Sequence, residues 1–419
     1  MAQFAAFFQT CDARGTCSCG QSRYVRMMRD PARLLTLDAM RGFAVMGILL
    51  MNVIAFSMPD MAYINPRLWG GETPAAFAVW TANFILVDGK MRGLFSLLFG
   101  ASAVLIQQRL ADRGEGLGLL YRRFFWLFLL GLCHYVFLWW GDILRLYAVA
   151  GFVLLLFVRR EPGDLLGSAI LFFLIQFAIV AAFSVSLLVG GEASLPGTDA
   201  ATLREQAALH QSGYGAIVAD RLARIGSDQT ALLVLSGFEA LGFMLLGAAM
   251  LKSGFLTGLW QKAEYLRIAR LCYIAGGGPM IALAAWCWGS GFDPVVTFNA
   301  VISWSLPFRV PLTIAHAALL MWLILHFDGS RMIRWIGAAG RTAFSNYIGT
   351  SIVMTTLFYG YGLGLYGRVD RVTVYLFVPL VWSLMLLWPL PWLRHFRYGP
   401  FEWAWRSLTR WRWEPIRRC

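Results

Sequence analysis

The chain has 419 residues, of which 58% are hydrophobic and only 14% are charged. This composition excludes an ordinary soluble enzyme and predicts an all-α, polytopic helical membrane protein embedded in a lipid bilayer. The net charge is +13, but the basic residues form short clusters between apolar runs. That arrangement indicates membrane topology and not a nucleic-acid partner.

The N-terminal tail, residues 1–32, has no basic segment ahead of its weakly apolar start, so we expect a loose cytoplasmic tail and no cleaved signal. A single transmembrane domain is predicted over residues 33–393. It opens with RLLTLDAMRGFAVMGILLMN, in which Asp38, Arg41 and Asn52 fall on one helical face. Polar side chains facing lipid are costly, so this face should point into a bundle or a cavity.

About ten transmembrane helices are expected, because each crossing needs roughly 20 apolar residues. Residues 74–88 are too short to cross and are predicted to form a partly inserted helix that breaks at a cavity, at Asp88-Gly89-Lys90. Twelve crossings result if 73–88 and 294–308 each span. The expected crossings are 42–59, 91–108, 124–141, 146–158 with its outer flank, 165–191, 229–251, 271–289, 310–327, 342–361 and 372–393.

The longest polar stretch is 192–228, an expected extracytoplasmic loop with a helix at 202–223 outside the bilayer. The segment 394–419 is basic and rich in Trp, which suits a cytoplasmic tail on the membrane surface. An even number of crossings puts both termini on one side. Most Lys and Arg residues lie on that side, so the positive-inside rule predicts cytoplasmic termini in a bacterial inner membrane.

His134 and Asp142 are the first candidate pair for chemistry, since a carboxylate that contacts an imidazole fixes its tautomer and raises its basicity. Each residue also has a structural alternative, as a packing imidazole or as an interface turn neutralised by Arg145. Ionisable groups inside a span are functional candidates by default. Glu239 must pair, protonate or face water, and its candidate partners are Lys90, Arg92 and Arg309. His316 is a further candidate that more often has a packing role.

The sequence contains no motif for nucleotide, serine-hydrolase or zinc-protease chemistry in a context that would confirm it. The cysteine and histidine spacings predict no metal site. Phosphate recognition can still come from Arg41 together with basic inner loops, among them the one that ends at Arg341, because guanidinium binds phosphate bidentately. A CoA-like ligand that approaches from the cytoplasm would meet these side chains.

Five ordered motifs carry a resemblance to the bacterial YeiB-type family of multispanning membrane proteins. These are RLLTLDAMRGFAVMGILLMN, KMRGLFSLLFGAS, HYVFLWWGDILRLYA, GAAGRTAFSNY and GPFEWAWRSLT. They run from about residue 33 to residue 418. The opening LD-x-x-RG also resembles the heparan-α-glucosaminide N-acetyltransferase and acyltransferase-3 families, which implies acyl transfer from a cytoplasmic acyl-CoA.

This sequence departs from the pattern of these transferases at the position of the catalytic base. Asn52 stands where the acyltransferase-3 pattern has a histidine, and Asp88 matches the aspartate of the acetyltransferase pattern. Residues 53–133 contain no histidine. Either His134 replaces the base, or Asp88 or Asp142 works alone, or the protein is not an acyltransferase.

Three functions follow as hypotheses. The first is an acyl-CoA-dependent acyltransferase for a small-molecule, glycan or lipid acceptor, in which Asn52, Asp88, Lys90, His134 and Asp142 line the transfer chamber. The second is a transporter or flippase whose ion and substrate path uses Glu239, His316 and Arg309. The third is a scaffold or partner subunit without chemistry. A homodimer is compatible with each.

Overall fold

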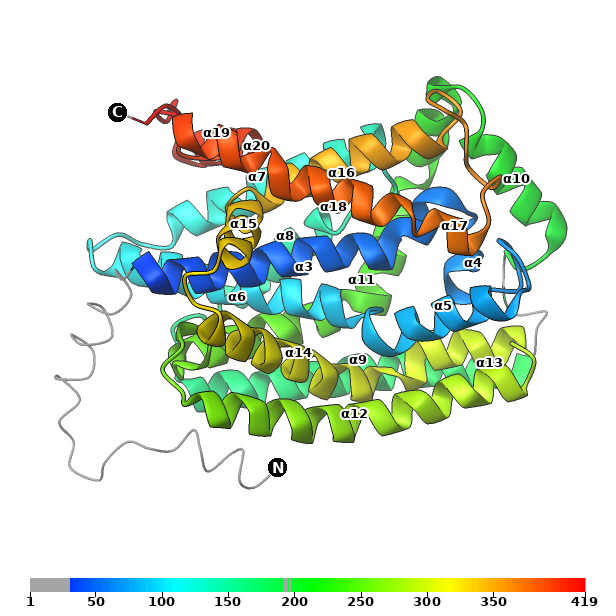
Figure 1. Cartoon of the computed structure of the whole chain (residues 1–419), viewed down its shortest axis with the longest axis horizontal. Coiled ribbons are helices and arrows are strands. Elements are labelled where there is room, and N and C mark those ends of the chain that lie inside the picture. The colour runs from blue at the N-terminus through cyan, green and yellow to red at the C-terminus, as the bar shows by residue number, and fades with distance from the viewer. Residues whose placement is uncertain (1–30, 191–194, 196, 419) are drawn as a thin grey trace.

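The computed structural model describes residues 31–190, 195 and 197–418 (Figure 1). Over these residues it contains helices and an isolated bridge between Phe396 and Arg417, and no β-strand. Eight of its helical segments are long and apolar enough to cross a membrane. The predicted fold class, a polytopic helical membrane protein, is therefore confirmed. The predicted tail 1–32 lies almost entirely outside the described residues.

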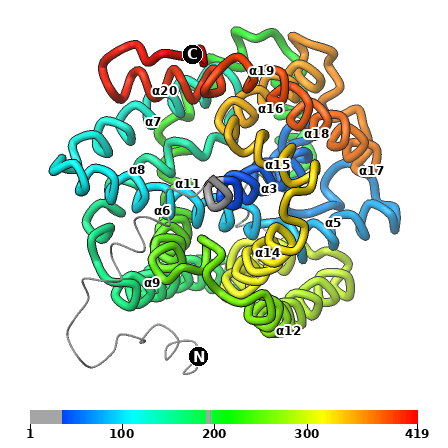
Figure 2. The backbone as a smooth tube through the Cα atoms, turned by 60° about the vertical axis from the view of Figure 1, so that its left-hand side comes forward, coloured from blue at the N-terminus to red at the C-terminus, as the bar shows by residue number. Residues whose placement is uncertain are grey.

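The helix α3 (Pro31–Ser57) runs through the middle of the bundle, with α6, α14, α15, α16 and α18 packed around it (Figure 2). Its central position follows from its sequence, because small or apolar side chains cover most of its circumference and a helix that is apolar on all sides is buried. The other long helices are α6 (Lys90–Ala111), α7 (Gly118–Phe137), α9 (Pro162–Gly190), α11 (Tyr214–Lys252), α12 (Lys262–Gly289), α14 (Leu306–His326) and α16 (Ala343–Phe358). The shorter helices α18 (Phe377–Leu387) and α19 (Pro389–His395) follow one another within one apolar segment, Arg371–His395.

Short helices complete the fold at both ends of the bundle and within it. They are α4 (Asp60–Ile64), α5 (Pro74–Leu86), α8 (Leu144–Leu154), α10 (Ala200–His210), the 3-10 helix η2 (Phe255–Thr257), α13 (Pro294–Asn299), the π-helix η3 (Ala300–Trp304), α15 (Arg331–Arg341), α17 (Arg371–Val374) and α20 (Pro400–Arg410). In Figure 1, α15 and α20 lie at one end and α4 and α10 at the other. We call these the α15–α20 end and the α4–α10 end.

The short helix expected at 74–88 is present as α5, and the chain turns at residues 87–89 before α6 begins. Gly89 takes a left-handed φ of 72°, which a side chain would disfavour. A small cavity lined by Asn83, Phe84 and Asp88 adjoins the turn. Both the predicted break and its position at a cavity are thus found.

One boundary differs from the sequence prediction. The helix expected at 202–223 is interrupted near Gly213, and α11 then runs unbroken for 39 residues into the sixth span. Polarity changes along α11, but no proline interrupts it, so the backbone continues the helix through the change. The fourth crossing, α8, has only 11 residues, as the short apolar run predicts.

Two pairs of glycines let helix backbones approach closely. A Cβ on Gly42 would collide with the carbonyl oxygen of Ile336, and one on Gly340 would collide with that of Asp38, where α15 crosses α3. Gly100 and Gly247 are reciprocal in the same way where α6 crosses α11. The hydrophobic effect does not drive helices together in lipid, so close van der Waals packing at small residues stabilises such crossings instead. The α3–α15 crossing sets the position of Asp38 and Arg41.

Candidate functional site

A cavity of about 460 Å³ opens at the α15–α20 end of the bundle. Its size falls within the range typical of small-molecule sites, roughly 300 to 1,000 Å³. The helices α3, α6, α7, α8, α15, α16 and α20 all contribute to its wall. The sequence prediction that the polar face of α3 meets a cavity holds for Asp38 and Arg41, which both line it.

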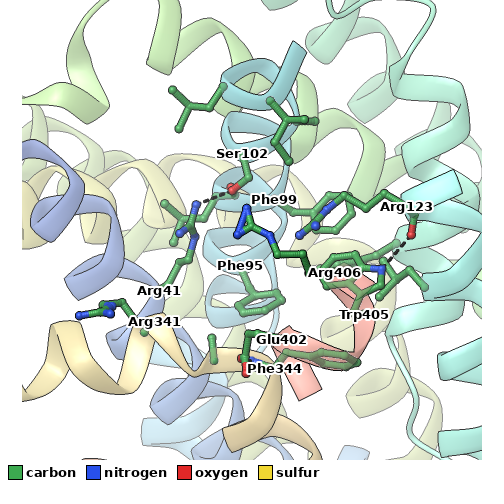
Figure 3. A pocket seen from close by; sticks show the side chains of 18 of the residues that line it. Arg41, Phe95, Phe99, Ser102, Arg123, Arg341, Phe344, Glu402, Trp405 and Arg406 are labelled. Atoms are coloured by element: carbon green, nitrogen blue, oxygen red, sulfur yellow. Dashed lines mark hydrogen bonds between the residues drawn. The ribbon is translucent and has the colours of Figure 1, made fainter. Parts of the chain in front are cut away.

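The cavity wall carries an excess of positive charge. Its described lining includes two carboxylates, Asp38 and Glu402, and six arginines: Arg41, Arg109, Arg123, Arg341, Arg397 and Arg406. Figure 3 shows Arg41, Arg123 and Arg406 directing their guanidinium groups toward one region of the cavity, beside Ser102. Such a concentration of guanidinium groups attracts phosphate or carboxylate groups of a ligand.

Several of these arginines are oriented by neighbours that leave N–H groups for a ligand. Arg41 bonds Asp38 at 3.0 Å and the hydroxyl of Ser102 at 2.6 Å. The guanidinium carbon of Arg123 lies 3.5 Å from the centre of the Trp405 ring, and that of Arg406 lies 4.5 Å from the Tyr398 ring. Stacking on an aromatic ring fixes a guanidinium group without neutralising its charge.

The second carboxylate, Glu402 of α20, is committed to the N-terminus of α16. Its side chain accepts hydrogen bonds from the backbone N–H groups of Phe344, at 2.6 Å, and Ser345, at 3.0 Å, and from the Ser345 hydroxyl. Burial raises the pKa of Glu402, while the bonds from Ser345 oppose that shift. This contact joins the motifs GAAGRTAFSNY and GPFEWAWRSLT, and it attaches the C-terminal segment to the cavity wall.

Away from the arginines the cavity wall is apolar and aromatic. Phe95, Phe99 and Phe124 form part of it, and Tyr147 and Tyr347 also line it. A ligand that fits both parts has an anionic group and an apolar portion. The described residues hold no group of three His, Cys, Asp or Glu side chains that could bind a metal ion.

His134 and Asp142 lie directly behind the Tyr347 side of the cavity. The Nδ1 atom of His134 is 2.9 Å from Oδ1 of Asp142, and its ring centre is 4.9 Å from that of Tyr347. The second oxygen of Asp142 accepts bonds from the backbone N–H and Nε of Arg145, at 3.0 and 3.3 Å. His134, Asp142 and Arg145 are each 2% exposed. The contact left open by the sequence therefore exists, and Arg145 also takes part in it.

A second buried cluster surrounds Glu239 in the bundle interior. Its carboxylate pairs with Arg92 at 2.8 Å and with Arg309 at 3.3 Å. The amide oxygen of Gln176 accepts from the backbone N–H of Glu239. The cluster reaches the cavity wall through Tyr147, whose hydroxyl donates to the carbonyl of Arg92. Glu239 therefore pairs with two of the cations that the sequence offered as its partners. This pairing is a structural role, because the arginines compensate the buried charge of the carboxylate.

The remaining candidates lie apart from His134. Asp88 accepts a hydrogen bond from the hydroxyl of Tyr63, and Lys90 donates to the carbonyl of Phe84 at 2.6 Å. His316 bonds the carbonyl of its own helix, at Leu312. Asn52 lies on α3, partly exposed, and lines neither described cavity. The five residues expected in one chamber are thus divided between separate locations.

Sequence reasoning missed Ser351, Tyr347, Arg123 and the α20 residues Trp405 and Arg406. Tyr347 and Ser351 are four residues apart on α16, and this spacing places both on the His134 side of that helix. The motifs that contain Tyr347, Trp405 and Arg406 were visible in the sequence. Their convergence was not, because it depends on how α16 and α20 pack against α7 and α8.

Comparison with known proteins identifies the family to which this arrangement belongs. The chain is 32% identical over 390 residues to the uncharacterized protein YeiB of Escherichia coli, covering 90% of this chain and 96% of YeiB. It is 32% identical over 407 residues to the uncharacterized protein YxaH of Bacillus subtilis, covering 92% of this chain and 96% of YxaH. The chain belongs to the YeiB-type family. A third relative, an uncharacterized 39.9 kDa protein of Bacillus acidopullulyticus, is 24% identical over 388 residues.

Within this YeiB-type chain, residues 250–412 match the family model described as a protein of unknown function, DUF418. That region contains α15, α16 and α20, so it supplies Arg341, Tyr347, Glu402 and Arg406 to the cavity. The other wall, which contains Arg41 and Arg123, comes from the N-terminal part of the chain, and so does His134, which lies behind it. The candidate site is therefore formed where these two parts of the sequence meet.

Proposed function

We propose that this protein is a membrane acyltransferase that takes its acyl group from an acyl-CoA-type donor. The acceptor is a hydroxyl or amine of a small molecule, glycan or lipid at the membrane or its outer face. The observation that carries the proposal is the cavity itself: an arginine-rich entrance leads along an aromatic wall to Tyr347, and His134 paired with Asp142 lies immediately behind it.

The two parts of the cavity match the two parts of such a donor. The phosphates of CoA pair with Arg41, Arg123, Arg341 and Arg406, and the acyl thioester lies against Phe95, Phe99 and Tyr347. Arginine is suited to this role because its planar group binds phosphate oxygens bidentately. The positive-inside rule puts the arginine-rich entrance and both termini in the cytoplasm of an inner-membrane protein, where acyl-CoA is found.

His134 supplies the proton transfer that acyl transfer needs. Asp142 at Nδ1 favours the tautomer in which Nε2 is unprotonated and can accept a proton. Nε2 then deprotonates the attacking hydroxyl or amine, and the imidazolium that forms is stabilised by Asp142. Arg145 keeps the carboxylate oriented by holding its other oxygen.

The test is turnover of acetyl-CoA by the purified full-length protein in lipid nanodiscs, followed as release of CoA with and without added acceptors. We expect His134→Ala to lower the rate by about 10²- to 10⁴-fold, the usual contribution of a general base. His326→Ala is the matched control, because His326 is exposed at the end of α14 and stacks on Trp322. Full turnover by His134→Ala would exclude this residue as the base.

A transporter or flippase is the second candidate, because an arginine-rich cavity with an apolar wall also fits an anionic lipid. The pairing of Glu239 with two arginines disfavours that carboxylate as a free proton-coupling group. Translocation of a labelled anionic lipid in proteoliposomes, with no acetyl-CoA turnover and no CoA binding, would support transport over acyl transfer.

A further inference from the structure

The second ring nitrogen of His134 has a partner of its own. Nε2 lies 2.8 Å from the hydroxyl oxygen of Ser351, while Nδ1 lies 2.9 Å from Asp142. The three side chains come from α16, α7 and the segment before α8, far apart in the sequence. Ser351 is 1% exposed, and His134 and Asp142 are 2% exposed. The fold therefore lines up a hydroxyl, an imidazole and a carboxylate in that order.

The direction of the proton in this arrangement follows from the donors and acceptors present. Asp142 accepts from the backbone N–H and Nε of Arg145 with one oxygen, and with the other it accepts from Nδ1–H of His134. With its proton on Nδ1, the neutral ring has an acceptor at Nε2. The Ser351 hydroxyl lies 2.8 Å from Nε2 and 3.4 Å from its other acceptor, the carbonyl oxygen of Tyr347, so the shorter bond to Nε2 is the favoured one. A serine hydroxyl bonded in this way is activated as a nucleophile, because its proton has a base to move to.

Ser351 does not line the cavity itself but lies next to a residue that does. It lies one helical turn from Tyr347 on α16, and Tyr347 is the lining residue whose ring packs on His134. The Tyr347 hydroxyl accepts a 3.3 Å bond from the backbone N–H of Ile143. Because the Tyr347 ring lies between the cavity and His134, attack by Ser351 on a thioester held in the cavity requires this ring to move aside.

We propose that Ser351 carries the acyl group covalently, so that transfer proceeds in two half-reactions; this rests on the proposed acyltransferase function. In the first, His134 takes the proton of the Ser351 hydroxyl, and Oγ attacks the thioester carbonyl. The C–S bond breaks, an ester forms on Ser351, and His134 returns the proton to the departing CoA thiolate. In the second, His134 deprotonates the acceptor, which attacks that ester, and the proton returns to Oγ of Ser351 as the C–O bond to the serine breaks.

The experiment uses acetyl-CoA as the probe and needs no acceptor. Purified full-length protein in nanodiscs is mixed with acetyl-CoA, quenched in acid within milliseconds and analysed for released CoA and for acetylated peptides. The expected result is a burst of about one CoA per protein, with the acetyl group on the peptide containing Ser351. Ser351→Ala should abolish the burst while it still binds CoA, and Ser351→Cys should carry the acetyl group as a thioester that neutral hydroxylamine removes.

Thr350→Ala is the matched control, since Thr350 is buried beside Ser351 on α16 and its hydroxyl bonds only the carbonyl of Asn346 among the described residues. It should keep the burst. Turnover by Ser351→Ala at the wild-type rate, or an acetyl group on another residue such as His134, would overturn the role of Ser351 but leave the acyltransferase function standing. Wild-type protein that neither binds acetyl-CoA nor releases CoA from it would overturn both.

Discussion

His134 is held in one orientation by hydrogen bonds at both ring nitrogens, and Glu239 is held by two arginines. The two sites use similar residue types in opposite ways. At Glu239 both carboxylate oxygens pair with arginines, so the carboxylate is committed to ion pairs. At His134 the carboxylate lies on one side of the ring and a hydroxyl on the other, so the ring can take the proton of the hydroxyl while the carboxylate stabilises the imidazolium. This difference separates a structural cluster from the candidate catalytic one.

A change at Glu239 should act on stability. Glu239→Gln leaves the buried Arg309 and the partly buried Arg92 without an anion, and breaking a buried ion pair costs about 3–5 kcal/mol. We expect a marked fall in the thermal unfolding temperature of the detergent-solubilised protein. The control is Glu205→Gln on the exposed face of α10. An unchanged unfolding temperature for Glu239→Gln would show that the cluster is hydrated and not a dry ion pair.

A change at Arg341 should act on ligand binding. Arg341 and Arg334 are both exposed on helix α15, but Arg341 lines the cavity and Arg334 does not. We expect Arg341→Ala to weaken CoA binding about 10-fold or more, because a charge-assisted hydrogen bond contributes about 1.5–3 kcal/mol. Arg334→Ala should leave the affinity unchanged. Titration calorimetry at two salt concentrations measures both; equal effects of the two variants would argue for a general charge effect and against a defined phosphate site.

At the scale of elements, α15 is the helix that brings the ends of the chain together. Its glycines pack on α3, its last residue Arg341 enters the cavity, and the α16 that follows is capped by Glu402 of α20. The motif residues Gly42 and Gly340 are thus explained by a helix crossing. Their contribution to function is indirect, because they fix the spacing between Arg41 and Arg341.

The α3–α15 crossing can be tested with one methyl group. Gly340→Ala forces a Cβ against the carbonyl of Asp38, and overpacking of this kind costs about 1–3 kcal/mol. Gly349→Ala is the matched control, because a Cβ at Gly349 on α16 meets nothing within 4 Å. We expect the first variant to unfold at a lower temperature and the second at the wild-type temperature or above. Equal stabilities would contradict the close crossing.

The α4–α10 end should respond to pH through Asp60. The pKa of Asp60 is raised to about 6, mainly by burial; Arg224 opposes this shift, and Asp228 and Asp220 contribute to it. The folded state therefore binds the proton more tightly than the unfolded chain, whose pKa for this group is 3.8. The stabilisation is complete below pH 3.8 and is lost as the pH rises through 6.

Hydrogen exchange of α4 and α10 between pH 4 and pH 8 measures this effect, after correction for the intrinsic exchange rate. Local protection should decline toward pH 7, and Asp60→Asn should remove that decline. His210 contributes a pH dependence of stability with the opposite sign, because burial lowers its pKa to about 4. The stabilisation that it contributes is therefore lost as the pH falls from 6.5 toward 4. A decline that persists in Asp60→Asn would exclude Asp60 as its origin.

At the scale of the whole molecule, the apolar pattern was enough to predict an all-helical membrane protein and the positions of its long helices. It also predicted α5, the break at Asp88-Gly89-Lys90 and the placement of Asp38 and Arg41 beside a cavity. Spacing alone could not predict that Ser351 reaches His134, because 217 residues separate them. Spacing also could not predict that Asp88 and Lys90 have other contacts than His134, since helices of equal hydrophobicity can pack in several orders.

The proposed topology makes a prediction for the intact molecule. On a cysteine-free background, Met332→Cys on α15 and Glu205→Cys on α10 are both at exposed positions. If the arginine-rich end is cytoplasmic, an impermeant maleimide labels Glu205→Cys in intact bacterial cells and labels Met332→Cys only after the membrane is permeabilised. The reverse pattern would place the cavity entrance on the outer side and remove the supply of acyl-CoA.

The most direct measurement is a cryo-electron microscopy structure of the protein with a non-hydrolysable acyl-CoA analogue. We expect density in the cavity, with phosphates against Arg41, Arg123 and Arg341 and the acyl chain directed to Tyr347, on the side where His134 and Ser351 lie. A cavity that stays free of the analogue at saturating concentration, or that holds an anionic lipid in its place, would contradict it.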